Sequence, residues 1–278
     1  MSERKAVMTG AERHELEREP IRISVAGPAN EGKTSVLRTL GEDAEFGVVT
    51  AEPGSSRKVA TLPVTVCGQH GIHVFDTPGF QMSAEITKRL DNPSGGGLLD
   101  EVLRVIPENE QDFAHDLAAW KQVAQSHMVF LVIDVTHCPA GRINDDLNLL
   151  SKCGRPTIVL LNFVPENHQD SKAMENLERW KKELAGYGFF QVTEFDAHRR
   201  NFENQLELLT RARLALDRPS YRKAIQTWID ECKEGEDVRL CSAVGGIASL
   251  VLDLALFRKM KASVPPEQVE NRRTQIEV

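Results

Sequence analysis

The chain has 278 residues, of which 41% are hydrophobic and 27% are charged, and its formal net charge at pH 7 is −7. These values are typical of a soluble globular protein and exclude fibrous and disordered classes. The acidic balance also disfavours a protein that coats nucleic acid non-specifically, because such binding needs Lys and Arg to neutralise phosphates.

The first 20 residues, MSERKAVMTGAERHELEREP, contain no apolar stretch of the length that a secretory signal requires. We expect residues 1–20 to be a flexible, charged N-terminus. The five cysteines lie far apart and form no C-x-x-C pair, which favours reduced thiols. The sequence therefore predicts a cytoplasmic protein.

Six apolar, β-branched runs predict the strands of a mostly parallel sheet. They occupy residues 21–27, 59–67, 72–76, 127–135, 156–164 and 188–196. Helical periodicity follows at residues 143–153, 171–186 and 201–216. Strands that alternate with helices of this length predict an α/β fold, with crossover connections and helices on both faces of the sheet.

The segment 81–126 is longer than one crossover requires, and we expect it to be an insertion with helical structure around residues 98–125. After Pro219 the strand patterns stop and the chain becomes helical. The expected domain organisation is an α/β domain over residues 21–218, a helical C-terminal domain over 219–262 and a polar tail over 263–278.

Residues 27–34 read GPANEGKT and satisfy the pattern G-x-x-x-x-G-K-[ST], between a predicted strand and a helical pattern. The glycines let backbone N–H groups face phosphates at a helix N-terminus. We expect Lys33 to reach the β- and γ-phosphates and the Thr34 hydroxyl to bind Mg²⁺. The alternative is a glycine-rich turn without a ligand. The nucleotide-binding residues expected in this loop are Gly27, Pro28, Ala29, Asn30, Glu31, Gly32, Lys33, Thr34 and Ser35.

Asp76 and Gly79 form a D-x-x-G element at the end of the third predicted strand. An aspartate there can hold Mg²⁺ through water, and the Gly79 N–H can bond to a γ-phosphate, so the following loop would respond to the nucleotide. Between the two motifs, residues 52–57 read EPGSSR and could supply a second hydroxyl to Mg²⁺. The alternative for each element is a plain turn.

The element that reads the base departs from the N-K-x-D pattern of GTPases, in which the Asp accepts hydrogen bonds from guanine. The fifth predicted strand ends in NFVP, which keeps Asn162 and lacks the Lys and Asp. Phe163 could cover the base with an apolar face, and Glu166 or Asp170 could supply the missing carboxylate. This departure weakens the expected preference for guanine without removing nucleotide binding.

A second loop that contacts the base is expected after the last predicted strand, where Asp196 and Ala197 lie. Asp196 is a further candidate for reading guanine. The alternative is that Asp196 caps the helix that follows.

The combination of GPANEGKT, PGSSR, DTPGF and LLNFV resembles the Era/TrmE-like branch of the translation-factor class of GTPases. It resembles more closely a bacterial GTPase family with a helical C-terminal domain of unknown function, often encoded beside an uncharacterised membrane protein. The resemblance covers residues 21–217, and residues 219–260 loosely. It implies a Ras-like P-loop NTPase fold in three layers, and a molecular switch that hydrolyses GTP to GDP and phosphate with Mg²⁺.

The resemblance assigns further roles to single residues. Ser56 takes the place of the threonine that binds Mg²⁺ in these proteins, and with Lys33 and Gly79 it makes up the expected catalytic group. Asn30 matches an asparagine that helps to coordinate K⁺ in TrmE-like relatives, or it is a loop residue that tolerates an unusual backbone angle. Phe80 stands where Ras-like enzymes carry a water-orienting Gln, so hydrolysis should be slow without K⁺, a partner or self-association. Glu31 departs from the family pattern and is assigned no role of its own.

The C-terminal segment 241–257, CSAVGGIASLVLDLALF, is apolar apart from two serines and Asp253. We expect a helix packed on its neighbour or on the GTPase domain, with peripheral docking at the inner membrane or on a partner as the alternative. A transmembrane span is disfavoured, because a charge is costly within the bilayer.

The expected ligands are GTP and GDP, with Mg²⁺ and K⁺ as cofactors. The expected partners are an unidentified protein, with a membrane protein among the candidates, and a second copy of the chain in a nucleotide-dependent homodimer; no sequence-specific nucleic acid is expected. Two other functions stay open: a broad NTPase or ATPase, and a nucleotide-bound scaffold with little turnover. The loops 47–58 and 77–97 are the expected switches.

Overall fold

The structure is a computed structural model of the chain. It describes residues 8–42, 45–46, 59–90, 97–106, 108–139, 141–164, 171–189, 191–197 and 201–263. The chain divides into two compact units, Met1–Ile229 and Asp230–Val278. The division falls within a helix, after the boundary near Pro219 that the sequence suggests.

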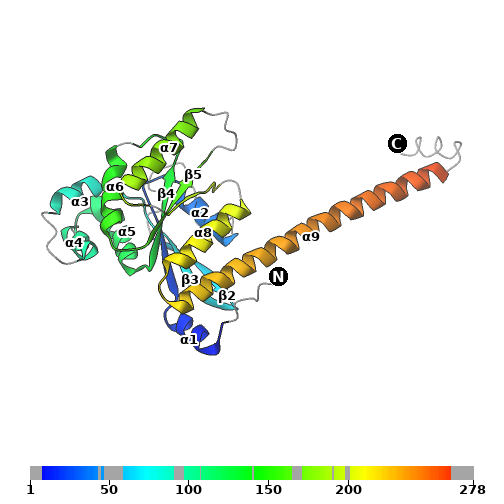
Figure 1. Ribbon diagram of the computed structural model, residues 1–278, viewed down its shortest axis with the longest axis horizontal. Helices are drawn as coiled ribbons and strands as arrows, with labels where there is room; N and C mark the ends of the chain where they lie inside the picture. The colour runs from blue at the N-terminus through cyan, green and yellow to red at the C-terminus, as the bar shows by residue number, and fades with distance from the viewer. Residues whose placement is uncertain are drawn as a thin grey trace. The chain divides into compact units, whose positions relative to one another are not determined.

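The first unit is built on a six-stranded, mostly parallel sheet, as predicted (Figure 1). The strand order is β2-β3-β1-β4-β5-β6, and β2 alone runs antiparallel to its neighbour. Since the order reverses at β1, the carboxyl end of β1 is the switch point where ligands bind in open α/β sheets. The strands are β1 Ile21–Ala26, β2 Ala60–Val66, β3 Gln69–Asp76, β4 Met128–Asp134, β5 Thr157–Asn162 and β6 Val192–Glu194.

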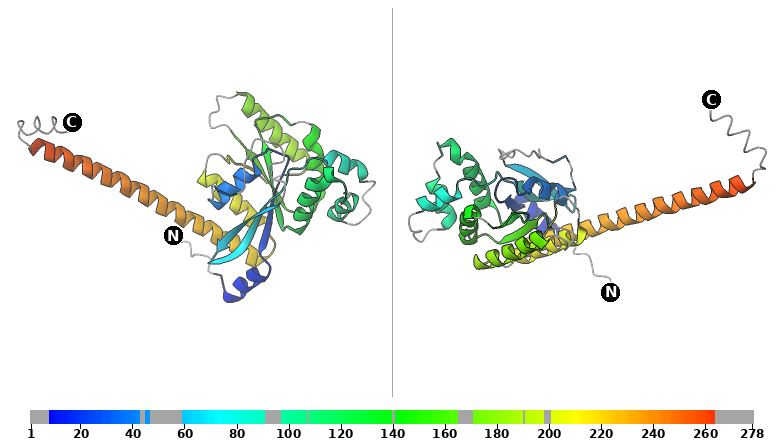
Figure 2. Two further views of the ribbon diagram at one scale, coloured as in Figure 1. Left: turned by 180° about the vertical axis from the view of Figure 1, so that it is seen from behind. Right: turned by 90° about the horizontal axis from the view of Figure 1, so that it is seen from above.

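Helices cover both faces of the sheet and form its outer layers (Figure 2). Val129, Leu131 and Ile133 of β4 belong to a core cluster that also includes side chains of α5, α6 and α7. Because side chains alternate along a strand, the intervening β4 residues face the opposite layer, which holds α2 and α8. These covering helices are α2 Lys33–Gly41, α5 Ala114–Gln125, α6 Gly141–Lys152, α7 Ser171–Gly186 and α8 Phe202–Ala215.

The segment expected as an insertion contributes to the main core. It contains α3 Ser83–Arg89, α4 Leu98–Val105, the 3₁₀ turn η1 Gln111–Phe113 and α5. Val102 of α4 and Trp120 of α5 are completely buried and join the same cluster as β4. The helical stretch expected around residues 98–125 is therefore broken into short helices that contribute to the same core as β4.

The N-terminus is helical where the structure describes it, which corrects the flexible segment expected for residues 1–20. Helix α1, Gly10–Arg18, starts with a capping box in which Thr9 Oγ1 accepts from the Glu12 N–H and Glu12 Oε2 accepts from the Thr9 N–H. Leu16 is buried, and Lys223 Nζ lies 2.8 Å from Glu12 Oε2. Capping, burial and an ion pair therefore hold this helix in place.

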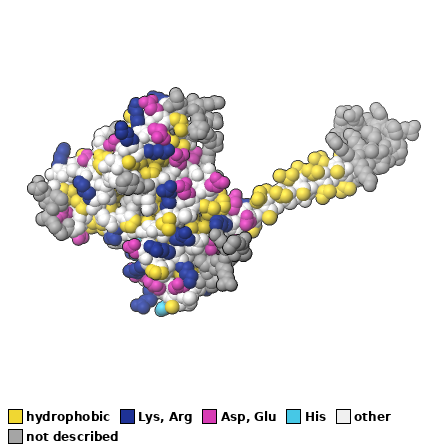
Figure 3. Space-filling view, viewed as in Figure 1, with side chains coloured by type: hydrophobic (Ala, Val, Ile, Leu, Met, Phe, Trp, Pro, Cys, Tyr) yellow, Lys and Arg dark blue, Asp and Glu magenta, His cyan; other side chains and the backbone are white. Residues whose placement is uncertain are grey.

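Helix α9, Pro219–Ser263, starts in the first unit and continues into the second. In the first unit Tyr221, Ile225 and Trp228 are buried. In the second unit every residue from 240 to 257 is exposed, and apolar side chains lie along the helix (Figure 3). Taken by itself, the second unit therefore buries no side chain of residues 240–257.

Candidate functional site

The loop between β1 and α2 needs glycine at two positions. Gly27 and Gly32 have φ angles of 138° and 89°, which side chains rarely adopt. A Cβ on Gly27 would lie 2.5 Å from the Val132 carbonyl oxygen, and a Cβ on Gly32 would lie 2.3 Å from Asn162 Nδ2. The loop therefore wraps tightly between the ends of β4 and β5 and turns into the N-terminus of α2, as a phosphate-binding loop requires.

Lys33 is the first residue of α2, and its side chain is buried against this loop. Its Nζ donates to the Pro28 carbonyl oxygen at 2.5 Å, so the ammonium lies inside the turn of the loop. Burial lowers the pKa of Lys33, and the nearby carboxylates of Asp76 and Glu31 oppose that shift. The charge is thus placed where phosphate oxygens would be its natural acceptors.

Thr34 and Asp76 meet across the ends of α2 and β3. Thr34 Oγ1 donates to Asp76 Oδ2 at 2.6 Å, and both residues are buried. A hydroxyl and a carboxylate are the hard oxygen donors that Mg²⁺ accepts. The pair therefore fits a Mg²⁺ ion that is held beside the phosphates.

The D-x-x-G element lies directly on the phosphate-binding loop. A Cβ on Gly79 would lie 2.6 Å from both Cα and N of Ala29. The Phe80 N–H donates to the Gly27 carbonyl oxygen at 3.2 Å, and Thr77 Oγ1 donates to the Val25 carbonyl oxygen at 2.8 Å. The two motifs that the sequence places far apart are therefore in backbone contact.

Phe80 is a core residue, with only 1% of its surface exposed. Its ring stacks on Trp120 of α5 at 5.0 Å between centroids. Asp116, one turn earlier on α5, accepts hydrogen bonds from the backbone N–H groups of Gln81 and Met82 at 3.1–3.2 Å. Burial raises the pKa of Asp116, and these hydrogen bonds oppose the shift. Asp116 and Trp120 were not predicted as site residues, because no local motif in the sequence marks them.

Glu31 turns toward the end of β4, and its carboxylate accepts a hydrogen bond from the Asp134 N–H. Desolvation and the nearby charge of Asp134 raise the pKa of Glu31 to about 7. The hydrogen bond from the Asp134 N–H and the charge of Lys33 act in the opposite direction. Glu31 is therefore a half-buried carboxyl group in the loop, with its pKa near neutral pH.

Asn162 joins two parts of the site. Its Nδ2 donates to the Glu31 carbonyl oxygen at 2.9 Å, and its Oδ1 accepts from the Ala197 N–H at 2.9 Å. Thr39 of α2 donates to the Ala197 carbonyl oxygen at 2.9 Å. Asn162 is completely buried, so it positions the phosphate-binding loop against the loop after β6.

The other residues that were predicted to contact the base lie in the loops after β5 and β6. Phe163 has a φ of 60°, and its Cζ would lie 3.1 Å from a Cβ on Gly32, so the ring lies against the phosphate-binding loop. Asp196 is half-buried next to the buried Ala197. The helix cap considered for Asp196 is instead Asn201, whose side chain accepts from the Asn204 N–H.

Asn30 is exposed and has a φ of 68°. This backbone angle gives a structural reason for an asparagine at this position, because Asn tolerates the left-handed region better than most residues. Ser56, Glu166 and Asp170 lie outside the described residues, as does the loop 47–58.

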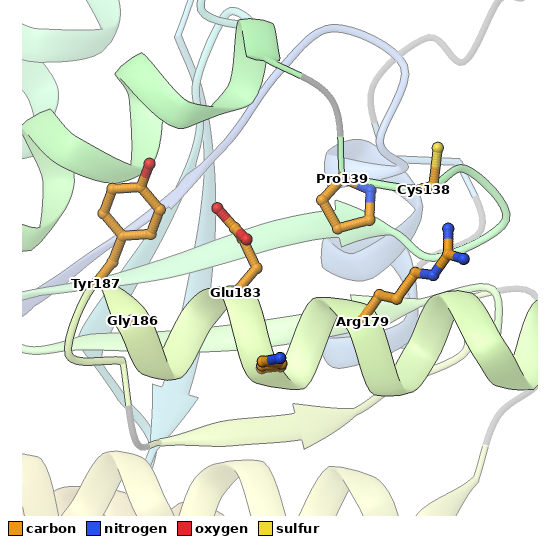
Figure 4. Close-up of a pocket in the computed structure, with 7 residues that line it drawn as sticks. Cys138, Pro139, Arg179, Glu183, Gly186 and Tyr187 are labelled. Carbon is orange, nitrogen blue, oxygen red and sulfur yellow. The ribbon is translucent and has the colours of Figure 1, made fainter.

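A separate cavity of about 600 Å³ lies on α7, between that helix and the loop after β4 (Figure 4). Cys138, Arg179 and Tyr187 are among its lining residues. None of the predicted nucleotide-binding residues lines it, so this cavity is separate from the predicted phosphate site. Among the described residues, no group of three His, Cys, Asp or Glu could hold a metal ion.

Residues 22–163 match the family model described as 50S ribosome-binding GTPase. The chain belongs to this GTPase family. The match starts in β1 and ends just after β5, so it includes the phosphate-binding loop, the D-x-x-G element and Asn162. The predicted resemblance to Era/TrmE-like P-loop GTPases is confirmed, and the chain is a GTP-binding protein of this class.

Curated relatives of this GTPase include two proteins named tRNA modification GTPase MnmE. The one from Desulfotalea psychrophila is 26% identical over 164 residues, which are 58% of this chain and 32% of the relative. The one from Leptothrix cholodnii is 32% identical over 127 residues, which are 45% and 22% of the two chains. GTPase Der from Caldanaerobacter subterraneus is 28% identical over 180 residues, 64% of this chain and 36% of the relative. These matches span less than half of each relative.

Two solved structures of Era are similar at low identity. Era in complex with MgGDPNP and a segment of 16S ribosomal RNA is 14% identical to this chain and has a TM-score of 0.48. The match covers 71% of this chain and 57% of the Era chain. Aquifex aeolicus Era bound to GDP·AlF₄⁻ is 16% identical with the same coverage and a TM-score of 0.47.

Proposed function

We propose that this GTPase binds GTP with Mg²⁺, hydrolyses it slowly to GDP and phosphate, and acts as a molecular switch in the cytoplasm. The observation that carries the proposal is the contact between Thr34 and Asp76, 2.6 Å apart, beside the backbone approach of Gly79 to Ala29. These contacts bring both Mg²⁺-binding groups and both phosphate-binding motifs to one end of the sheet.

Lys33 and the loop N–H groups bind the phosphates in this proposal. The ammonium exchanges its hydrogen bond to the Pro28 carbonyl for oxygens of the β- and γ-phosphates. Thr34 and Asp76 hold Mg²⁺, which neutralises charge on the phosphates, and Ser56 adds a second hydroxyl. The Gly79 N–H bonds to the γ-phosphate, so the loop after β3 differs between the GTP and GDP states.

Slow hydrolysis follows from the position of Phe80. A ring stacked in the core on Trp120 cannot orient an attacking water molecule by hydrogen bonding. We propose that K⁺ coordinated through Asn30, a protein partner or a homodimer formed in the GTP state completes the site. Asn30 is exposed at the loop, so its amide is accessible to an ion or to a partner.

Specificity for guanine rests on fewer groups than in GTPases with the full N-K-x-D element. Both ends of the Asn162 amide are used within the protein, which leaves Phe163 and Asp196 as the described candidates for contact with the base. The absent Lys and Asp favour a second candidate function, a broad NTPase that also accepts ATP. A nucleotide-bound scaffold with little turnover is the form this switch takes without its activator.

The output of the switch is proposed to pass through α5. Asp116 holds the two N–H groups that follow Phe80, and Trp120 packs on the Phe80 ring, so a shift of this loop changes contacts of α5. The partner that reads the change is a protein, with a membrane protein among the candidates.

Equilibrium binding of fluorescent GTP to the full chain tests this proposal, with ATP as the competitor. Lys33→Ala should weaken GTP binding by about 10–100-fold, because it removes charge-assisted hydrogen bonds to phosphate. Lys152→Ala, on the exposed end of α6, is the matched control and should leave Kd unchanged. Equal affinity for ATP would favour the broad NTPase, and binding insensitive to Lys33→Ala would overturn the proposed site.

A further inference from the structure

The second unit of the chain carries a helical segment whose apolar side chains are all exposed. Within α9, every residue from 240 to 257 is exposed, and Asp253 is the single charged residue among them. No other part of the described chain presents such a run. Its large apolar side chains, each more than half exposed, are Leu240, Val244, Ile247, Leu250, Val251, Leu252, Leu254, Leu256 and Phe257.

We propose that residues 240–257 form a transmembrane helix that anchors this GTPase in a lipid bilayer. The hydrocarbon of the bilayer is the occupant that covers these side chains. The inference stands on the second unit alone and does not depend on the nucleotide chemistry of the first.

The apolar side chains surround the helix instead of forming one stripe. Leu250, Val251 and Leu252 are consecutive and therefore point in three directions about 100° apart. The serines and Asp253 fall on one narrow line, since Ser242, Ser249 and Asp253 are seven and four residues apart. A helix that lies on a membrane surface needs a broad polar face, which this segment lacks. A helix that is apolar all round is buried in a core or spans a membrane, and none of this segment is buried.

The length of the segment matches a bilayer. Eighteen helical residues extend for about 27 Å, and the hydrocarbon core is about 30 Å thick. Arg239 precedes the segment, and Arg258 and Lys259 follow it. Basic residues at these sequence positions bound the apolar run, as is common at the two ends of a membrane span.

The charge of Asp253 is the reason that the sequence alone disfavours a transmembrane span. Asp253 lies one helical turn before Phe257, midway between the centre and the end of the segment, and the cost of a charge falls with distance from the bilayer centre. A helix of this composition located in the core of a soluble protein would be mostly buried, whereas none of this window is. Within the second unit, exposure on every side of the helix therefore favours the span.

Membrane fractionation of the full chain tests the proposal. The chain is expressed in a bacterial host, and its membranes are extracted with alkaline carbonate and floated through a density gradient. The wild type should float with the membranes after extraction. Leu250→Arg with Leu252→Arg places two charges at the centre of the segment and should reduce the floating fraction at least tenfold.

The matched control carries the same two charges on exposed apolar residues outside the segment. Leu214→Arg with Val238→Arg, at side chains that are 64% and 68% exposed, should float like the wild type. Thermal unfolding of the first unit, followed by circular dichroism, checks that both variants fold. Release of the wild type by carbonate, sedimentation without flotation, or equal loss of the control would each overturn the proposal.

Cysteine labelling separates a span from a helix that enters and leaves on one side. In sealed vesicles, a water-soluble maleimide should label Cys138 of the first unit from one side only. In Ser263→Cys, the new thiol should react only from the opposite side, and in Leu250→Cys it should be protected. Labelling of Cys138 and of Ser263→Cys from the same side would contradict the span.

Discussion

The ring of Phe80 stacks on the ring of Trp120, with centroids 5.0 Å apart and planes 25° apart. This contact ties the residue after the D-x-x-G element to α5, which lies in the segment that the sequence suggested was an insertion. The same helix supplies Asp116 to the next two backbone N–H groups. The loop that would sense the γ-phosphate is therefore held by two side chains of one helix.

Phe80→Gln should destabilise the protein without speeding hydrolysis. The amide would replace a buried ring beside Trp120 and lose both packing and hydration, at a cost of about 2–4 kcal/mol in the free energy of unfolding. Urea unfolding and phosphate release measure the two effects, with Phe80→Leu as the apolar control. A tenfold gain in turnover would mean that this position can orient water and that its place in the core does not explain slow hydrolysis.

Asp116→Ala should loosen the start of α3. The substitution leaves the N–H groups of Gln81 and Met82 without their acceptor, at a cost of about 1–3 kcal/mol. Amide hydrogen exchange should rise over residues 81–86, while exchange in β5 changes little. Asp116→Asn keeps one acceptor oxygen and should fall between the wild type and the alanine variant. Unchanged exchange in the alanine variant would show that Asp116 does not hold the loop.

Glu31 should make stability depend on pH. Its pKa of about 7 in the folded state lies above the ordinary value of 4.5, so the folded state binds the proton more tightly than the unfolded state does. The stability linked to this proton is complete below pH 4.5 and is lost as the pH rises through 7, by up to about 3 kcal/mol. Glu31→Gln keeps an acceptor for the Asp134 N–H and removes the titration. Denaturation at pH 5 and pH 8 should therefore show a smaller loss in the variant, and equal losses would contradict the prediction.

Asn162→Ala should weaken both folding and nucleotide binding. It removes the bridge between the Glu31 carbonyl and the Ala197 N–H and leaves both buried groups unsatisfied, at about 2–4 kcal/mol. Binding of GTP should weaken about tenfold, because the two loops lose their mutual position. Asn162→Asp keeps the acceptor for the Ala197 N–H, but it replaces the donor to the Glu31 carbonyl by a carboxylate oxygen, which repels that carbonyl. Wild-type affinity of Asn162→Ala for GTP would exclude the positioning role.

The local patterns predicted much of the fold and of the phosphate site. The structure explains the glycines of the run GPANEGKT. Gly27 and Gly32 have backbone angles that side chains rarely adopt, and a Cβ at either position would clash with its neighbours. The strands could be read from apolar runs because both faces of the central strands are buried. Helix α1 also has a local signal, since Thr9 and Glu12 have the spacing of a capping box, although a flexible segment was predicted there.

Other parts of the site depend on contacts between distant residues and have no local pattern. Asp116 contacts a loop 35 residues earlier in the chain, and Asn162 contacts the phosphate-binding loop 131 residues away. The exposure of the apolar part of α9 is likewise a tertiary property. The apolar run alone suggested a packed helix. Its exposure on every side in the second unit is what favours a transmembrane helix instead.

Phosphate release from GTP and from ATP, with Mg²⁺ in parallel KCl and NaCl buffers, tests the central claim most directly. The wild type is compared with Lys33→Ala and Asn30→Ala. We expect turnover of GTP alone that is lost in Lys33→Ala, faster in KCl, and insensitive to the choice of cation in Asn30→Ala. Turnover of GTP that persists in Lys33→Ala would contradict the proposed GTPase site.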